Sequence, residues 1–229
     1  MKIIETIAEI RALRRSAQKI AFVPTMGNLH AGHIDLCLRA KAENDIVVAS
    51  VFVNPTQFNQ ASDFEKYART LEADRNLLSD AGVDYLFNPA AADMYADGYT
   101  VKVSEDEIAQ ELEGAFRPGH FTGMLTVVLK LLNIIGADRA YFGEKDFQQL
   151  KLIEDMVTSF FMNIEIVHGK TIREDSGLAM SSRNRRLSPA GFEKAALIYK
   201  LLKNESSVEN IKKQHQYYCK LFASWKYKF

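Results

Sequence analysis

Two histidines, His30 and His33, with Gly32 between them, are the residues of this chain best placed to do chemistry. They follow a short apolar run at 20–23 and a glycine-containing loop, and they precede a helix-like segment at 34–42. A helix N-terminus offers unpaired N–H groups and a positive dipole end, so it suits an anion, most often a phosphate. We therefore predict that both imidazoles face the phosphates of a nucleotide. The alternative is that backbone groups merely satisfy two histidines at a helix start.

A second polar cluster follows the next apolar run, 46–53, and contains Asn54 and Gln57. Ligands of open parallel sheets bind beyond the carboxyl ends of the strands, which places both amides at the mouth of the cleft that holds the histidines. Gln149 also comes soon after a predicted strand. An amide can both donate to and accept from a hydroxy acid. Single glutamines are more often solvated, so position alone argues for Gln57 and Gln149.

A lysine, Lys145, lies in a loop between a predicted strand at 139–142 and a predicted helix at 147–162. Such a lysine is often a solvated surface charge. Because Gly143 flanks it and Gln149 follows one helical turn later, we interpret Lys145 as a point charge on the phosphates.

Three further charged residues have both an ordinary and a functional interpretation. Asp74 is either an exposed helix carboxylate or a group that helps to place Mg²⁺, which bridges carboxylates and substrate phosphates. Glu113 and Arg117 are four apart, so they can form a plain helical ion pair.

The elements that must position these residues follow from hydrophobic periodicity. The run at 46–53 is apolar almost throughout, which is typical of a strand buried on both faces in a parallel sheet, and strand–helix–strand at this spacing is a βαβ unit. We predict helices over 3–17, 64–81 with a break near Thr70, 104–113 behind a capping box of Ser104 and Glu107, 122–135 and 190–203. Further strands are predicted at 84–87, 100–103 and 164–167.

Composition limits the class of partner. Lys+Arg and Asp+Glu both number 29, so the net charge is zero and a nucleic-acid partner is not expected. Cys37 and Cys219 are the only cysteines, which predicts neither a disulfide framework nor a metal cluster and fits a reduced, cytoplasmic setting. The N-terminus lacks a signal-peptide core, and the longest apolar run is far shorter than the ~18 residues that span a bilayer, so we expect no membrane association.

The stretch around the histidines, Pro24-Thr25-Met26-Gly27-Asn28-Leu29-His30-Ala31-Gly32-His33, resembles the HxGH signature of the adenylyl-transferring α/β superfamily. Its fuller form is similar to that of the pantothenate synthetase (pantoate:β-alanine ligase) family. Four more motifs stand in the order and approximate spacing of that family: Phe52-Val53-Asn54-Pro55-Thr56-Gln57-Phe58, Arg117-Pro118-Gly119-His120-Phe121, Gly143-Glu144-Lys145-Asp146-Phe147-Gln148-Gln149 and Met180-Ser181-Ser182-Arg183-Asn184. The resemblance covers roughly residues 1–188.

The resemblance implies a Rossmann-like, doubly wound parallel sheet over 1–170 that binds ATP and pantoate. It also implies a two-step ligation, in which pantoate attacks ATP to give pantoyl adenylate and pyrophosphate, and β-alanine then gives pantothenate and AMP. ATP with Mg²⁺, small-molecule substrates and a homodimer are the expected cofactors and partners.

The resemblance also assigns residues. It implies that the catalytic residues are His33, His30, Lys145 and Arg183. It also implies that His33 donates a proton. It implies that Gln57 and Gln149 hold pantoate, that Asn54, Glu113 and Arg117 border that site, and that Asp74 serves the metal. The residues implied to contact ATP are Pro24, Thr25, Met26, Gly27, His30, His33, Gly143, Glu144, Lys145, Asp146, Ile172, Met180, Ser181, Ser182 and Arg183. Ser181 to Arg183 also have an ordinary interpretation as a turn.

Residues 171–229 are expected to form a small, incomplete C-terminal lid domain. The family has a longer C-terminal part with strands and an aliphatic segment, and residues 206–229 show no equivalent. We expect this to weaken closure of the site and to impair activity, with part of the adenylate lost before the second step.

Two other functions compete with this interpretation. A nucleotidylyltransferase of the same superfamily would adenylate a phosphorylated cofactor precursor, but it would need cations for a second phosphate, where this chain has Gln57 and Gln149. A shortened protein that binds ATP or pantoate and turns over poorly is the second alternative.

Overall fold

The structure, a computed structural model, describes residues 1–15 and 18–204 of the 229-residue chain. The chain divides into two compact units, Met1–Ile172 and Arg173–Phe229. Cys219 and the segment 206–229, which is expected to hold no equivalent of the family's lid, lie outside the described residues. No helix in the described ranges is long and apolar enough to cross a membrane.

A six-stranded, fully parallel sheet forms the first unit, with the order β1-β4-β3-β2-β5-β6. The strands are β1 (Lys2–Ile4), β2 (Ile20–Thr25), β3 (Ile46–Val51), β4 (Tyr85–Phe87), β5 (Arg139–Gly143) and β6 (Glu165–Gly169). From β2 the chain winds outward through β3 and β4, and it then crosses to β5 on the other side of β2. The winding therefore reverses between β2 and β5, and such a switch point is where open parallel sheets bind their ligands.

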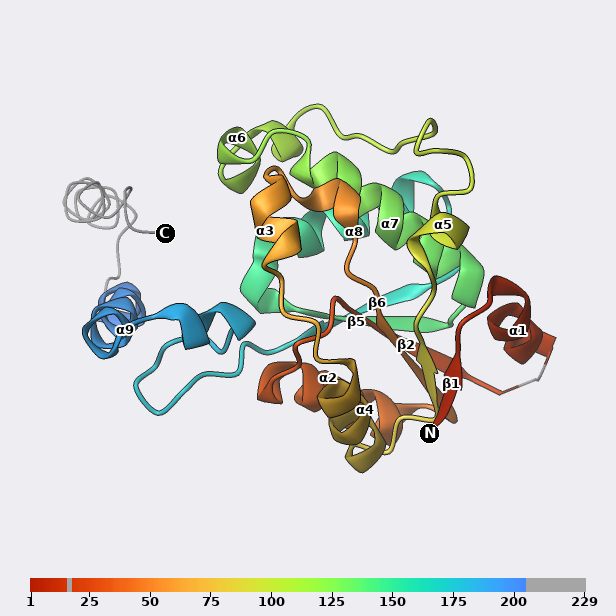
Figure 1. Cartoon of the computed structure of the whole chain (residues 1–229), viewed down its shortest axis with the longest axis horizontal. Helices are drawn as coiled ribbons and strands as arrows, with labels where there is room; N and C mark the ends of the chain where they lie inside the picture. The colour runs from red at the N-terminus through yellow and green to blue at the C-terminus, as the bar shows by residue number, and fades with distance from the viewer. Residues whose placement is uncertain (16–17, 205–229) are drawn as a thin grey trace. The chain divides into compact units, whose positions relative to one another are not determined.

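Helices cover both faces of the sheet, as Figure 1 shows: α2 and α4 lie below it and α7 and α8 above it. Residues of β2 alternate between the two cores, with Phe22 packed in the core of α7 and α8 and Val23 in the core of α2 and α4. This double burial explains the unbroken apolar strands and confirms the predicted Rossmann-like fold. The main helices are α1 (Ile7–Ala12), α2 (Ala31–Glu43), α4 (Leu71–Asp80), α7 (His120–Ile135) and α8 (Phe147–Ser159).

Several of the segments that connect the main elements contain short helices. They are α3 (Ala61–Glu65), α5 (Ala91–Met94), α6 (Glu113–Phe116) and the 3₁₀ helices η1 (Leu13–Arg15), η2 (Pro55–Gln57), η3 (Ile108–Gln110) and η4 (Glu144–Asp146). The second unit contains η5 (Ser182–Arg186), α9 (Pro189–Asn204) and an isolated antiparallel bridge between Arg173 and Ala179.

Three predicted elements are wrong in part or in whole. The helix over 3–17 does not begin at its first apolar residue, because Ile3 and Ile4 pair with β4 and the Thr6 side chain caps α1 at Ile7. Neither the strand over 100–103 nor the helix over 104–113 forms: in the segment that precedes η3, the Glu105 carboxylate accepts hydrogen bonds from Glu107 N and Ala109 N. That side chain closes a turn in place of the expected capping box. The predicted break near Thr70 is confirmed by the gap between α3 and α4.

Candidate active site

The loop that follows β2 is held in shape by a buried carboxylate. Gly27 and Asn28 both have left-handed backbones, with φ of 75° and 53°. Asn28 N and Leu29 N donate to the two oxygens of Asp74 at 2.9 and 2.8 Å. A Cβ on Gly27 would lie 2.9 Å from Asp74 Oδ2, so only glycine lets the loop lie this close to α4. The alternative that Asp74 is an exposed carboxylate is wrong, because the residue is 1% exposed.

The two histidines cap helix α2 through one ring nitrogen each. His30 Nδ1 accepts from Gly32 N at 3.1 Å, and His33 Nδ1 accepts from His30 N at 3.3 Å. The ring centroids are 4.0 Å apart. Since a neutral imidazole whose Nδ1 accepts must carry its proton on Nε2, both rings are Nε2–H donors. Backbone N–H groups therefore do satisfy one nitrogen of each histidine, as the alternative interpretation expects. The same contacts fix the tautomer that donation to a phosphate needs.

His33 is a neutral donor at physiological pH. Burial, then the proximity of His30, then the charge of Lys145 lower the pKa of His33 from 6.5 to about 3. The influence of Lys145 on this pKa indicates that the loops after β2 and β5 approach each other across the switch point. A neutral imidazole suits hydrogen-bond donation to phosphate, and a pKa this low does not favour the expected role of His33 as a proton donor.

The low pKa of His33 predicts a pH-dependent stability. The unfolded chain takes up a proton on His33 near pH 6.5 and the folded chain only near pH 3, so folding loses stability as the pH falls between these values. A His33→Asn variant keeps an acceptor for His30 N but cannot titrate. We expect its unfolding free energy to fall less steeply below pH 6.5, by up to about 1.4 kcal/mol per pH unit. Urea unfolding at several pH values between 7 and 5 measures the two slopes, and parallel slopes would contradict the assignment.

On the other side of the switch point lies η4, which carries Glu144, Lys145 and Asp146 after Gly143. Lys145 is exposed, and its Nζ lies 3.8 Å from Asp146 Oδ2. Apart from Gly143 and its two chain neighbours, no described residue has an atom within 4 Å of the position a Cβ would take on Gly143, so a ligand can approach the backbone there. These four predicted ATP residues therefore share one open loop.

The remaining predicted ATP residues of the first unit lie close to the signature loop. Thr25 is 8% exposed, and its hydroxyl donates to Ser50 O at 2.6 Å and accepts from Gly27 N at 3.1 Å. These hydrogen bonds hold the start of the loop against β3. Pro24, the residue before Thr25, is half-buried. Met26 contacts Gln57 through its sulfur. Ile172 lies 3.9 Å from the position a Cβ would take on Gly32.

Asn54 is a buried residue that holds η2 in place, and its contact with the substrate stays a prediction. It is 1% exposed, and its Nδ2 donates to Gln57 Oε1 at 3.0 Å and to Gly123 O at 3.2 Å. Its Oδ1 accepts from Thr56 N and Oγ1 and from Tyr95 OH. With every polar atom engaged inside the protein, Asn54 fixes η2 beside the sheet.

Gln57 is oriented rather than solvated, because the side chain lies between Asn54 and Met26. Its Nε2 donates to Met26 Sδ at 3.1 Å, and the residue is 8% exposed. Gln149 is half-buried in the first turn of α8, and its side chain has no hydrogen bond to another residue in 1–15 or 18–204. Each amide keeps polar capacity that a hydroxy acid can use.

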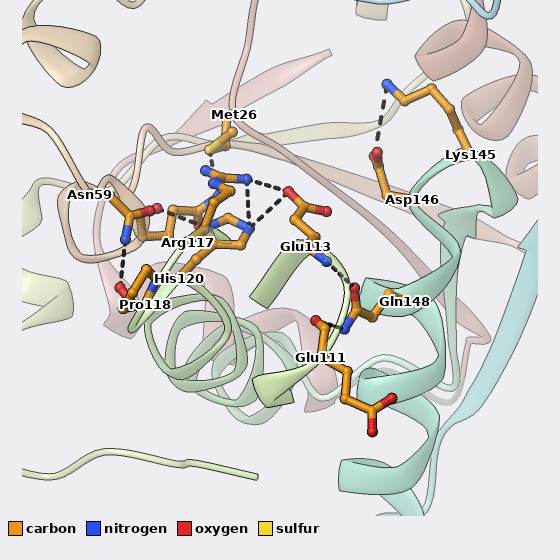
Figure 2. Close-up of polar contacts among 11 residues, drawn as sticks. Met26, Asn59, Glu111, Glu113, Arg117, Pro118, His120, Lys145, Asp146 and Gln148 are labelled. Atoms are coloured by element: carbon orange, nitrogen blue, oxygen red, sulfur yellow. Dashed lines mark hydrogen bonds and ion pairs between the residues drawn. The ribbon is translucent and has the colours of Figure 1, made fainter. Parts of the chain in front are cut away.

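A buried histidine that sequence reasoning did not select, His120, joins the substrate-side residues (Figure 2). His120 is 5% exposed, and its Nδ1 lies 2.8 Å from Gln57 O, which can only accept. Its Nε2 therefore accepts from Arg117 Nη1 at 3.1 Å and lies 3.8 Å from Glu113 Oε1. Arg117 also pairs with Glu113. The i,i+4 ion pair is thus present, but it is part of a network that reaches Gln57. The Arg117–Phe121 motif was the signal that could have identified His120.

Gln148, next to the predicted Gln149, ties this network to α8 (Figure 2). Its Nε2 donates to Ile108 O at 2.7 Å and to Glu111 O at 2.9 Å, and its Oε1 accepts from Glu113 N at 3.1 Å. It therefore positions the segment that carries Glu113. Sequence reasoning missed it because its partners lie 35 to 40 residues away.

A cavity of about 370 Å³ lies against this network. Its lining includes Gln57, His120, Asn59, Lys102 and Thr122. The walls are largely polar, so the space beside the Gln57 backbone is accessible to small polar molecules.

The last predicted ATP residues, Met180 to Arg183, belong to the second unit. The Ser181 hydroxyl caps η5 by accepting from Arg183 N at 3.2 Å, and Arg183 is exposed. The turn of the ordinary interpretation is therefore real. Contact of Met180, Ser181, Ser182 and Arg183 with ATP stays a prediction.

The expected Mg²⁺ does not fit Asp74 well. Both of its oxygens accept hydrogen bonds from the signature loop, and Oδ2 also accepts from Thr70 Oγ1 at 3.0 Å. Within the described part of the chain, no group of three His, Cys, Asp or Glu side chains could hold a metal ion.

A parallel sheet with two Nε2–H donors at a helix start, opposite a lysine-bearing loop at the switch point, defines an α/β nucleotide-binding enzyme. Comparison with known proteins gives the family: the model described as Pantoate-beta-alanine ligase matches residues 2–226, and the chain belongs to that family.

Similar proteins carry the same name. The pantothenate synthetase of Bdellovibrio bacteriovorus is 50% identical over 207 residues, which are 90% of this chain and 82% of that protein. The pantothenate synthetase of Legionella pneumophila strain Lens is 48% identical, with 93% of this chain and 86% of that protein covered. The crystal structure of the Francisella tularensis ligase complexed with beta-gamma ATP and beta-alanine has a TM-score of 0.86 at 47% identity, over 93% of this chain and 84% of that one.

Proposed function

We propose that this protein condenses pantoate with β-alanine at the expense of ATP, which is the activity of the family to which it belongs. The observation that carries the proposal is the pair of imidazoles whose Nδ1 atoms cap the start of α2, together with Lys145, whose charge acts on His33. Those groups suit a triphosphate, and the amides of Gln57 and Gln149 suit a hydroxy acid.

In the first step, a carboxylate oxygen of pantoate attacks the α-phosphorus of ATP. A new O–P bond forms, the bond between the α-phosphorus and the bridging oxygen breaks, and pyrophosphate leaves with that electron pair. Negative charge grows on the leaving pyrophosphate and on the equatorial oxygens. The Nε2–H groups of His30 and His33, the ammonium of Lys145 and the N-terminus of α2 stabilise that charge. Gln57 and Gln149 hold pantoate for the attack, with Glu113 and Arg117 at its border.

In the second step, the neutral amine of β-alanine attacks the carbonyl carbon of pantoyl adenylate. A C–N bond forms, the C–O bond breaks so that AMP leaves with its electron pair, and the nitrogen gives up one proton to solvent as pantothenate is released. Positioning and electrostatic stabilisation carry the rate, so no covalent bond to the enzyme is required. Ser181, Ser182 and Arg183 are proposed to contact the phosphates from the second unit.

We further propose that the protein acts as a homodimer in the cytoplasm and that Mg²⁺ accompanies ATP. Light scattering after size-exclusion chromatography measures the mass in solution. A mass of twice 25.9 kDa is expected, and a mass of 25.9 kDa contradicts the dimer.

A pyrophosphate-release assay separates the candidate functions. We expect release that requires both ATP and pantoate, and pantothenate only when β-alanine is added. Release with nicotinamide or pantetheine phosphates and none with pantoate would identify the nucleotidylyltransferase instead. ATP binding without any release would support the binding-only alternative.

A further inference from the structure

Asp74 is more deeply buried than a metal ligand of an open nucleotide site should be. It lies in the first turn of α4, is 1% exposed, and accepts hydrogen bonds from Asn28 N, Leu29 N and Thr70 Oγ1 at 2.9, 2.8 and 3.0 Å. Two of these donors are consecutive backbone groups of the signature loop. The carboxylate thus binds the loop much as a protein binds a small anion.

Resting on the proposed function, we propose that Asp74 is a positioning residue: it anchors the signature loop so that His30 begins α2, and it does not ligate Mg²⁺. The left-handed Gly27 and Asn28 turn the backbone so that two N–H groups converge on one side chain. The next residues are the histidines. Loss of the anchor would therefore displace the Nε2–H donors from the phosphates.

The geometry leaves no room for a hydrated cation at Asp74. Mg²⁺ requires octahedral ligands at 2.0–2.1 Å and usually keeps several waters. Three donors already occupy the carboxylate, and the Gly27 backbone lies so close that even a Cβ would come within 2.9 Å of Oδ2. The loop N–H groups and the N-terminal end of α4 already balance the buried charge. A divalent cation would then reach the site on the triphosphate.

Amide hydrogen exchange on the protein without nucleotide or metal tests the anchor directly. In Asp74→Asn, an NH₂ group replaces one acceptor, so at least one loop N–H faces a donor. We expect exchange at Asn28 and Leu29 to become at least about 10-fold faster, while amides of β5 and β6 stay as protected as before. The matched control is Glu72→Gln, which removes the same charge from an exposed position in the same turn of α4. Unchanged exchange at Asn28 and Leu29 in Asp74→Asn would overturn the anchor.

Activity separates positioning from metal binding. For Asp74→Asn we expect kcat for pyrophosphate release to fall by about 100-fold, because a small displacement of reacting groups is costly. The Mg²⁺ concentration at half-maximal rate should stay within about 2-fold of the unchanged protein. A several-fold higher Mg²⁺ requirement with kcat preserved at saturating Mg²⁺ would overturn the proposal.

Binding of Mn²⁺ without ATP tests the proposal on the unchanged protein, so the result does not depend on whether a variant folds. Electron paramagnetic resonance should detect no protein-bound Mn²⁺ at millimolar concentrations without ATP. Tight binding that Asp74→Asn abolishes and Glu72→Gln keeps would contradict the proposal. Because exchange and Mn²⁺ binding need no substrate, they stand even if pantoate proves not to be the substrate.

Discussion

Replacing Lys145 by alanine is expected to lower the rate of pyrophosphate release by about 100- to 1000-fold, which corresponds to about 2.7–4 kcal/mol of transition-state stabilisation. The ammonium lies opposite the histidines, where its charge already lowers the pKa of His33. The charge that it stabilises develops only as pyrophosphate leaves, so kcat should fall more than ATP affinity. Because Lys145 is exposed, the fold should not change.

Lys151→Ala is the matched control for Lys145→Ala. Lys151 lies six residues further along, in α8, and is exposed in an i,i+4 pair with Asp155. Its removal should leave the rate within about 2-fold, since such pairs contribute little. An unchanged adenylation rate in Lys145→Ala would show that Lys145 takes no part in the reaction.

The second large effect is expected at Gly123, where α7 packs against the backbone of η2. A Cβ there would lie 2.3 Å from Thr56 O and 2.9 Å from Gln57 Cα, and neither is the end of a flexible side chain. Gly123→Ala must push η2 and α7 apart. We expect the unfolding free energy to fall by about 1–3 kcal/mol. Since η2 carries Gln57, the KM for pantoate should rise more than the KM for ATP.

Denaturant unfolding and steady-state kinetics measure the two effects of Gly123→Ala. Gly143→Ala is the control for stability alone, because apart from its chain neighbours no described residue has an atom within 4 Å of its added Cβ. Equal stability of both variants would show that α7 and η2 adjust without cost. If stability falls while the KM for pantoate stays constant, Gln57 does not bind the substrate.

The parts of the site that sequence predicted are those encoded locally. His30 and His33 are neighbours on one helix start, so their shared direction follows from the chain itself. The apolar strand at 46–53 required burial on both faces, and the parallel sheet followed from it. The polar loops after β2, β3 and β5 then had to meet at one edge of the sheet.

The parts that sequence did not predict depend on contacts between distant segments. Asp74 binds Asn28 across 46 residues, and His120 reaches Gln57 O across 63. The position of an acid in a helix does not show whether it is buried against a loop or exposed, so the sequence of α4 does not reveal that Asp74 contacts the signature loop. Asn54 was placed correctly at the strand end, but only its partners revealed that it is saturated. The spacing of Ile3 and Ile7 fits a helix, and this predicted a helix from Ile3 onward. The structure instead has a short strand at Lys2–Ile4, and Thr6 caps a helix that begins at Ile7.

The transfer of a carboxylate oxygen to AMP tests the central claim most directly. Pantoate labelled with ¹⁸O in its carboxyl group is converted with ATP and β-alanine, and the AMP and pyrophosphate are analysed by mass spectrometry. If the carboxylate attacks the α-phosphorus, each AMP formed from fully labelled pantoate carries one ¹⁸O and pyrophosphate carries none. Unlabelled AMP, or label in pyrophosphate, would contradict an acyl adenylate and with it the roles given to His30, His33 and Lys145.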